Sequence, residues 1–177
     1  MPDPAPDLPL LRPPQRKVPL GQAICEIPKL FRIGPSGLFD LLRAVAELAL
    51  ARYLLARRSV RQLGIPGKAP TLLNGAHSFV PLSAEQRAIV ARISYAMQVA
   101  PPRVPWRSDC LVQCLAARRW LGTLGIPARV SIGVKREAEG PLLAHAWLVV
   151  DDMAASDTVV TGGDLSGFSE FQVPPSL

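Results

Sequence analysis

Residues 106–114 read Trp-Arg-Ser-Asp-Cys-Leu-Val-Gln-Cys, and this stretch places Cys110 where a proline-rich loop gives way to a predicted helix. Ser108 or Asp109 can cap that helix, because either side chain can accept a hydrogen bond from a backbone N–H of the first turn. A cysteine in this turn lies near unpaired N–H groups and the positive end of the helix dipole, which favour the thiolate. The position of Cys110 therefore predicts a nucleophile.

One of the two histidines of the chain, His145, lies in an alternating apolar pattern over residues 142–150 that predicts a β-strand. A cysteine at a helix start, a histidine on a later strand and an acid after it make up a thiol-dependent acyl-transfer site. The N–H of Cys110, with a donor from loop 106–109, is expected to stabilise the oxyanion. The other histidine, His77, has no partner pattern and is interpreted as a surface residue.

Asp157 is the predicted third member of this site. If a tight turn is centred on residue 151, antiparallel pairing sets Asp157 opposite His145. Its carboxylate would then accept a hydrogen bond from one ring nitrogen and leave the other nitrogen for the sulfur of Cys110. Asp152 and Asp164 are the alternatives: Asp152 is a turn residue in this register, and Asp164 lies beyond the paired stretch unless the chain bulges.

Length and composition fit one catalytic domain in a reducing compartment. The 177 residues, 49% hydrophobic and 19% charged, can bury one sizeable core. Three cysteines are an odd number and no signal segment opens the chain, so we expect a cytoplasmic location and no disulfide scaffold. The net charge of +6 fits either an ordinary solvated surface or a site for an acidic peptide or partner. We expect neither nucleic acid nor a membrane as a partner.

Hydrophobic periodicity predicts three helices followed by a small antiparallel sheet, which is the α+β class. The first helix is expected over 38–63, and charged residues interrupt its apolar stretch too often for a membrane span: Arg43, Glu47 and Arg52. A capping box at Ser83 predicts the start of the second helix, and Gly125 the end of the third. The strands are expected over 129–134, 142–150, 154–160 and 168–173.

Further motifs make the chain recognisable. Residues 124–129 read Leu-Gly-Ile-Pro-Ala-Arg and lead into Ile-Gly-Val, while residues 144–147 read Ala-His-Ala-Trp, with Asp157 twelve positions after the histidine. Together with Cys110, these pieces resemble the lasso-peptide biosynthesis B proteins, which belong to the transglutaminase-like cysteine-protease group. The resemblance covers about residues 38–160. It implies a transglutaminase/papain-like core over residues 38–177, with Cys110 as nucleophile, His145 as base and acid, and Asp157 as orienting carboxylate.

What the resemblance implies for function is a peptidase acting without metal or cofactor. It would remove the leader from a ribosomally made precursor peptide, so that a partner ligase of the asparagine-synthetase type can close a macrolactam ring. Two alternatives stay open in the same fold. One is a transglutaminase-like acyltransferase, in which an amine replaces water, and the other is a peptide-binding module without catalysis.

Residues 1–37 depart from the family pattern. Relatives carry a leader-binding, winged-helix-like module before the protease part or use a separate small protein, and 37 proline-rich residues are too few for such a module. We therefore expect a partly disordered extension over 1–37 and a separate leader-recognition protein. The alternative is a weak remnant of the module over 21–33. Many relatives also carry Asn beside the acid, where this chain has Ser156.

The other two cysteines, Cys114 and Cys25, are predicted to be small buried apolar residues. A zinc site built from Cys110, Cys114 and His145 is the rival interpretation, but it lacks a fourth ligand. Trp106 and Trp147 are candidates for the walls of the cleft. We expect Trp147 to share the face of His145 only if the strand is irregular, so core packing is the preferred role for it.

Overall fold

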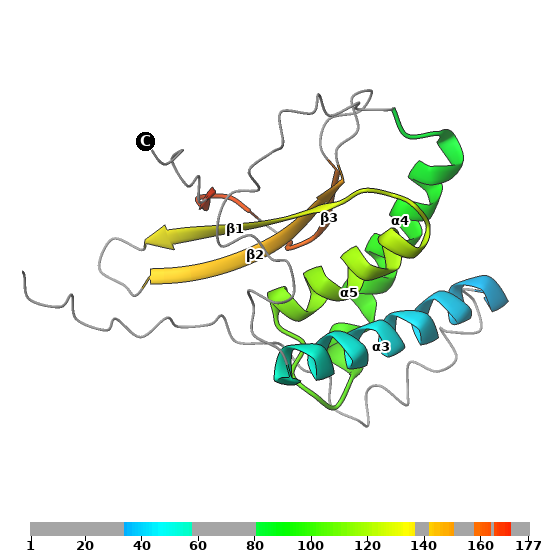
Figure 1. The fold of residues 1–177 in the computed structure, drawn as a ribbon, viewed down its shortest axis with the longest axis horizontal. Helices are drawn as coiled ribbons and strands as arrows, with labels where there is room; N and C mark the ends of the chain where they lie inside the picture. Colours follow the sequence, from blue (N-terminus) through cyan, green and yellow to red (C-terminus); the bar gives the residue numbers. More distant parts are fainter. Residues whose placement is uncertain (1–33, 58–80, 137–141, 151–157, 164, 171–177) are drawn as a thin grey trace, which may run out of the picture.

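The computed structural model describes residues 34–57, 81–136, 142–150, 158–163 and 165–170. Within these ranges three helices lie to one side of an antiparallel sheet of four strands, so the predicted α+β class is confirmed (Figure 1). Helix α5 packs against strand β2, helix α4 packs against strand β3, and helix α3 packs on both other helices. This arrangement buries α5, the helix with the candidate nucleophile, in the middle of the domain.

Helix α3 (Gly34–Arg57) begins four residues before the predicted start, inside the stretch assigned to the N-terminal extension. Residues 1–33 and 58–63 of the predicted elements lie outside the described residues. The buried face of α3 repeats every three or four residues and consists of Leu41, Ala44, Leu48 and Ala51. Glu47 is buried with them, where its carboxylate accepts a hydrogen bond from Arg119 Nε at 2.6 Å.

Helix α4 (Ala84–Val99) starts at the predicted capping box. The Ser83 hydroxyl accepts a hydrogen bond from the Gln86 N–H at 3.1 Å, and the Ser83 N–H donates to the Gln86 side chain at 2.9 Å. The helix ends at Val99, and a short 3₁₀ turn, η2 (Pro101–Arg103), follows. Both ends therefore lie where the cap and the prolines predict them.

Helix α5 (Cys110–Thr123) has Asp109 as its N-cap, so of the two predicted caps the acid is used. The Asp109 carboxylate accepts a hydrogen bond from the Val112 N–H at 3.4 Å. At the other end Gly125 has a φ of +69°, a left-handed conformation that glycine adopts without strain, and this stops the helix as predicted. The nucleophile candidate is thus the first residue of a capped helix.

The sheet has the order β3-β2-β1-β4, with β1 (Arg129–Arg136), β2 (Leu142–Val150), β3 (Thr158–Thr161) and β4 (Ser169–Glu170). Strand β3 runs one residue past the predicted end at 160, and β4 lies inside the predicted 168–173; residues 154–157 and 171–173 of the two predicted strands lie outside the described residues. Along β2, alternate residues enter the core against the helices: Ala146, Leu148 and Val150. Among the residues that the structure describes, no helix is long and apolar enough to cross a bilayer.

The register between β2 and β3 differs from the predicted one. Val150 pairs with Thr158, and Leu148 pairs with Thr161 after an irregularity between Leu148 and Val149. The pairing is therefore centred on residue 154, the midpoint of 150 and 158, and not on residue 151. The expectation that a turn at 151 sets residues 145 and 157 opposite each other is wrong, because a centre at 151 would pair residue 158 with residue 144, whereas Thr158 pairs with Val150.

Candidate active site

Cys110 occupies the first position of α5, where the backbone N–H groups of a helix have no partner within the helix. The residue is half-buried and packs at the edge of the hydrophobic core. Gln113 holds the preceding loop in place, because its side-chain amide donates a hydrogen bond to the Ser108 carbonyl at 2.8 Å. The helix start and the loop before it are therefore fixed to each other, and the thiol stays accessible in part.

The structure brings Cys110 and His145 together as a hydrogen-bonded pair. Burial, the largest influence on the thiol, raises the pKa of Cys110, but the hydrogen bonds from His145 and from the Ala146 N–H outweigh it, and the charge of His145 acts in the same direction. The pKa of Cys110 therefore lies below its ordinary value. The charge of Asp109, the helix cap, opposes this decrease.

His145 shows the matching change. The hydrogen bond to Cys110 is the largest influence and raises the pKa of His145; burial lowers it, and the Gly162 carbonyl and the charge of Cys110 raise it further. A thiol with a lowered pKa beside an imidazole with a raised pKa favours transfer of the proton from sulfur to nitrogen. Both shifts act toward the thiolate and imidazolium, which is the reactive form of a cysteine nucleophile.

Among the described residues, the Gly162 carbonyl, Trp147 and Phe168 contact the His145 ring besides the thiol. Its Nε2 atom lies 2.7 Å from the Gly162 carbonyl oxygen. The ring of Trp147 stacks at 6.4 Å between centroids, and the ring of Phe168 lies tilted at 5.2 Å. A carbonyl acceptor and two aromatic walls leave the imidazole little freedom to rotate.

Trp147 is buried, as predicted, but the expected relation to His145 is wrong. Residues two apart in a regular strand share a face, and the two rings are in fact stacked. Trp147 has 7% of its surface exposed, yet it stands apart from the cluster that Ala146 and Leu148 form with the helices. Its role is therefore to support the catalytic candidate from the same face of the sheet.

Two glycines make room for Trp147. A Cβ atom on Gly133, which pairs with His145 across the sheet, would lie 2.6 Å from the Trp147 ring and 2.6 Å from the Ser169 carbonyl. A Cβ on Gly162 would lie 2.5 Å from the Trp147 Cβ, and Gly162 has a φ of +125°. Neither position tolerates a side chain without a shift of the indole that supports His145.

Cys114 has the structural role that the sequence predicts. It has no exposed surface, and its sulfur lies 3.2 Å from the Thr161 hydroxyl. Burial raises its pKa to about 12, although the hydrogen bond to Thr161 acts in the opposite direction. Cys114 therefore remains a neutral thiol one turn away from Cys110, and the two cysteines are chemically distinct.

The predicted acid and several other candidates lie outside the described residues. These are Asp157, its alternatives Asp152 and Asp164, and also Ser156, Cys25 and His77. Because the β2–β3 register is not centred on residue 151, the geometric argument for Asp157 no longer holds, and only the family resemblance supports it. The acceptor that faces His145 among the described residues is the Gly162 carbonyl.

Sequence reasoning missed Gly162 and Phe168 as parts of the site. The Gly-Gly pair at 162–163 marks a special backbone conformation, but no sequence pattern says which main-chain carbonyl a histidine will meet. Phe168 follows another turn and reaches His145 only through the fold of the sheet. In the part of the chain that the structure describes, no group of three or more His, Cys, Asp and Glu residues could hold a metal ion.

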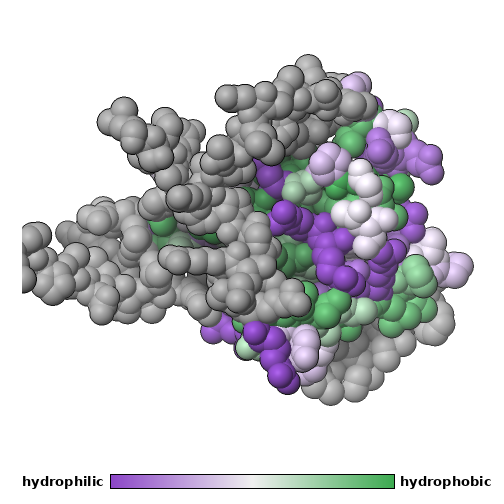
Figure 2. Space-filling view, in the orientation of Figure 1, coloured by the Kyte–Doolittle hydropathy of each residue, from purple (hydrophilic) through white to green (hydrophobic). Residues whose placement is uncertain are grey.

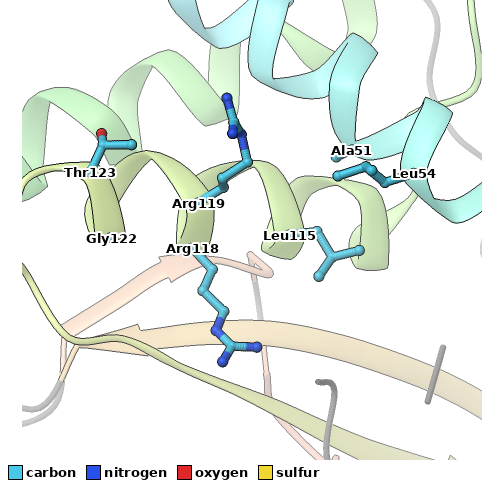
Figure 3. A pocket seen from close by; sticks show the side chains of 7 residues that line it. All are labelled: Ala51, Leu54, Leu115, Arg118, Arg119, Gly122 and Thr123. Atoms are coloured by element: carbon cyan, nitrogen blue, oxygen red, sulfur yellow. The ribbon is translucent and has the colours of Figure 1, made fainter. Parts of the chain in front are cut away.

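A cavity of about 420 Å³ lies between α3 and α5, away from the Cys110–His145 pair. Leu54 of α3 and Leu115 of α5 line it, and Arg118 and Arg119 leave α5 in different directions around it (Figure 3). Neither Cys110 nor His145 is among the residues that line the cavity. It is therefore not the place where a bond in a substrate would meet the nucleophile.

A comparison with protein families identifies the class of the chain. The model of the transglutaminase-like superfamily matches residues 48–172, a range that includes Cys110 and His145, so the chain belongs to this superfamily. The superfamily includes cysteine peptidases and acyltransferases, and its fold is typically a catalytic fold of the cysteine-protease type. No curated protein and no solved structure matches the chain.

Proposed function

We propose that this chain is a cysteine peptidase that removes the leader from a lasso-peptide precursor before a partner ligase closes the ring. The observation that carries the peptidase activity is the Cys110–His145 pair, in which the pKa of the thiol is lowered and that of the imidazole is raised. Support for the substrate comes from the resemblance of the segments around Cys110, 124–134 and 144–147 to the lasso-peptide B proteins. The proposed location is the cytoplasm.

In the proposed first step, the thiolate of Cys110 attacks the carbonyl carbon of the scissile bond. The negative charge moves onto the carbonyl oxygen, where the N–H of Cys110 at the helix start donates a hydrogen bond. The tetrahedral intermediate then collapses, the C–N bond breaks, and His145 gives its proton to the departing amine. The leader remains attached to Cys110 as a thioester.

In the proposed second step, water hydrolyses the thioester. His145, now neutral, accepts a proton from water as the hydroxide attacks the carbonyl carbon. The C–S bond breaks, the leader leaves as a carboxylic acid, and the thiolate and imidazolium are restored. We propose Asp157 as the carboxylate that orients His145, on the family resemblance alone, with Asp152 and Asp164 as alternatives.

The proposed partners are the precursor peptide, a separate leader-recognition protein and a ligase of the asparagine-synthetase type. A transglutaminase-like acyltransferase is the second candidate, because the same thioester can be attacked by an amine and the superfamily contains acyltransferases. A peptide-binding module without catalysis is the third. The lowered pKa of Cys110 argues against this third reading, because binding alone does not require an activated thiol.

Mass spectrometry of a candidate precursor incubated with the chain, with and without its recognition protein, tests the proposal. Cleavage at one site with addition of water supports the peptidase, whereas transfer of the leader to an added amine supports the acyltransferase. Cys110→Ala should lower the rate by about 10⁴-fold or more, since removing a triad nucleophile costs up to about 10⁶-fold. Cys114→Ala, one turn along the same helix, is the matched control and should retain activity.

A thioester intermediate that accumulates with Cys114→Ala but not with Cys110→Ala would place the nucleophile directly. Equal loss of activity in the two variants, with both proteins folded, would contradict the assignment of Cys110. Cleavage that survives Cys110→Ala would contradict the cysteine mechanism altogether.

A further inference from the structure

Helix α3 has an apolar stripe on the face that points away from the domain. Counted along the helix, its members are spaced by three and four residues in turn: Phe39, Leu42, Ala46, Ala49, Tyr53 and Ala56. All six are exposed, and the three large ones have 64%, 62% and 55% of their surface accessible, in the order Phe39, Leu42 and Tyr53. The outer face of a surface helix is normally polar, so this pattern is unusual.

This outer stripe is separate from the residues that hold α3 to the domain. The buried face, from Leu41 to Ala51, packs on α4 and α5. In Figure 1 α3 runs along the lower edge of the molecule, and Figure 2, in the same orientation, shows hydrophobic residues at the surface in that region. The helix is therefore apolar on two faces, of which the described fold covers one.

The spacing of the stripe fits a second helix. Apolar residues that alternate in steps of three and four form a straight seam along a helix, which is the pattern that a neighbouring helix packs against. The middle of the seam consists of the small residues Ala46 and Ala49, between Phe39 and Leu42 on one side and Tyr53 on the other. Small residues there let the backbone of a partner helix approach closely and let its larger side chains fill the centre.

The charges beside the stripe fit an acidic partner. The exposed charged residues of α3 are Arg52 and Arg57, and Arg57 lies over the Tyr53 ring at 5.3 Å. The two acids of α3 are turned toward the domain: Asp40 pairs with Arg92 at 2.8 Å, and Glu47 pairs with Arg119 at 2.6 Å. Two positive charges, those of Arg52 and Arg57, therefore lie beside the stripe on the exposed side of α3, and no acid of α3 is exposed to neutralise them.

The same charges argue against other occupants from this protein. Two copies of α3 packed on each other, parallel or antiparallel, would offer Arg52 and Arg57 no exposed acid of α3, because both acids pair toward the domain. Residues 1–33 carry five basic and three acidic side chains, and residues 58–80 carry three basic and no acidic ones. The acidic segments 137–141 and 151–157 have five and seven residues, too few to cover a stripe that runs from residue 39 to 56.

We propose that the outer stripe of α3 is the docking site for an amphipathic helix of a partner protein, with apolar residues at heptad spacing and acidic residues beside them. Such packing of one helix on another gives affinity through the apolar anchors and orientation through the charges. The inner face of α3 packs against α5, which begins with Cys110. A helix docked on the outer face of α3 would therefore be separated from α5 by α3 and would leave the Cys110 thiol accessible. The proposal does not depend on the peptidase assignment.

Two fluorescent helical peptides test the proposal on the full chain. Both carry the same apolar heptad seam; one has Glu at all flanking positions and the other has Lys. The acidic peptide should bind with a Kd on the order of 10–100 μM and at least about tenfold more tightly than the basic one, and its binding should weaken as salt increases. Equal binding of both peptides, or binding of neither in this range, would overturn the proposal.

Matched variants locate the binding. Tyr53→Glu should abolish binding of the acidic peptide, whereas Tyr95→Glu, at an exposed tyrosine of α4, should leave it unchanged. A double variant, Phe39→Glu with Leu42→Glu, keeps the test valid if Tyr53→Glu does not fold. Loss of binding with Tyr95→Glu to the same extent, in a folded protein, would place the site elsewhere.

Three measurements decide between occupants. Light scattering should show a monomer. A dimer that dissociates in the Leu42→Glu variant would mean that a second copy of this chain occupies the stripe, and would overturn the proposal. A cysteine introduced by Ala46→Cys should react with maleimide as fast as one introduced by Ala88→Cys, since Ala46 in the stripe and Ala88 of α4 are both exposed. Slower reaction of Ala46→Cys would mean that another part of this chain covers the stripe, and would overturn the proposal. Flotation with phosphatidylglycerol vesicles should be negative, since binding that requires the stripe would make an anionic membrane the occupant.

Discussion

The Nε2 atom of His145 lies 2.7 Å from the carbonyl oxygen of Gly162. A carbonyl oxygen only accepts hydrogen bonds, so Nε2 carries the hydrogen in both the neutral and the charged ring. This leaves Nδ1 as the nitrogen that would exchange a proton with Cys110 in the proposed mechanism. A main-chain acceptor thus performs part of the task that an orienting carboxylate performs in a Cys-His-Asp triad.

The first prediction concerns the acid. Because the Gly162 carbonyl already fixes the tautomer of His145, Asp157→Ala should lower kcat by about 10- to 100-fold, the range of one or two ordinary hydrogen bonds. Cys110→Ala should lower it far more. Steady-state cleavage of the precursor should be measured side by side for Asp157→Ala, Asp152→Ala and Asp164→Ala. The variant with the largest decrease in kcat identifies the acid that orients His145. A loss at Asp157 as large as that of Cys110→Ala would show that the carbonyl contributes nothing.

The second prediction concerns pH. The thiolate is required for attack and the imidazolium for protonation of the leaving amine, so kcat/KM should rise with pH through the lowered pKa of Cys110 and fall through the raised pKa of His145. These apparent values belong to the coupled pair. Alkylation of Cys110 by iodoacetamide should reach its plateau below the ordinary cysteine range of about 8.5.

His145→Ala provides the control for the pH dependence. Without the imidazole, the largest influence that opposes burial of the thiol is lost, so the pKa of Cys110 rises and the alkylation profile moves to higher pH. Cys114, whose pKa is raised to about 12, should stay unmodified throughout in folded protein. An unchanged alkylation profile in His145→Ala would mean that the helix start alone activates the sulfur.

The third prediction separates the two effects of Asp109, which caps α5 and whose charge raises the pKa of Cys110. Asp109→Asn keeps a capping side chain and removes the charge, so the acidic limb of the kcat/KM profile should move to lower pH, with about 0.3–1 kcal/mol less stability from the helix dipole. Asp109→Ala should show the same shift of the limb, and it should also cost about 1 kcal/mol for the lost cap. Identical thermal unfolding of the two variants would contradict the capping role.

Local signals in the sequence predict much of this fold. The capping box at Ser83, the cap before Cys110 and the glycine at 125 each act within one turn of a helix, and the structure has all three helix ends where those signals place them. The nucleophile candidate could be recognised for the same reason, because its reactivity begins with its position at a helix start. His145 could be found because a histidine stands out in an apolar strand pattern.

The parts that could not be predicted depend on contacts between distant segments. The β2–β3 register, with its irregularity between Leu148 and Val149, depends on pairing between two strands, which the hydrophobic periodicity of either strand alone does not reveal. The contact of His145 with the Gly162 carbonyl follows from this register. The sequence also does not show which apolar face of α3 is exposed, because helical periodicity alone does not tell which of two apolar faces meets the core.

The fourth prediction tests the support that Trp147 gives to His145. Gly133→Ala places a Cβ atom 2.6 Å from the indole and 2.6 Å from the Ser169 carbonyl, so the indole must move, at a cost of about 1–3 kcal/mol for overpacking. Because the indole stacks on His145, kcat should fall as well, and the alkylation profile of Cys110 should move to higher pH. Gly122→Ala is the matched control: it lies within α5 with nothing within 4 Å of the added Cβ, so it should stabilise the protein by about 0.5–1 kcal/mol. Thermal unfolding and the iodoacetamide profile of the two variants are the measurements, and a destabilised Gly133→Ala with an unchanged profile would show that Trp147 packs beside His145 without positioning it.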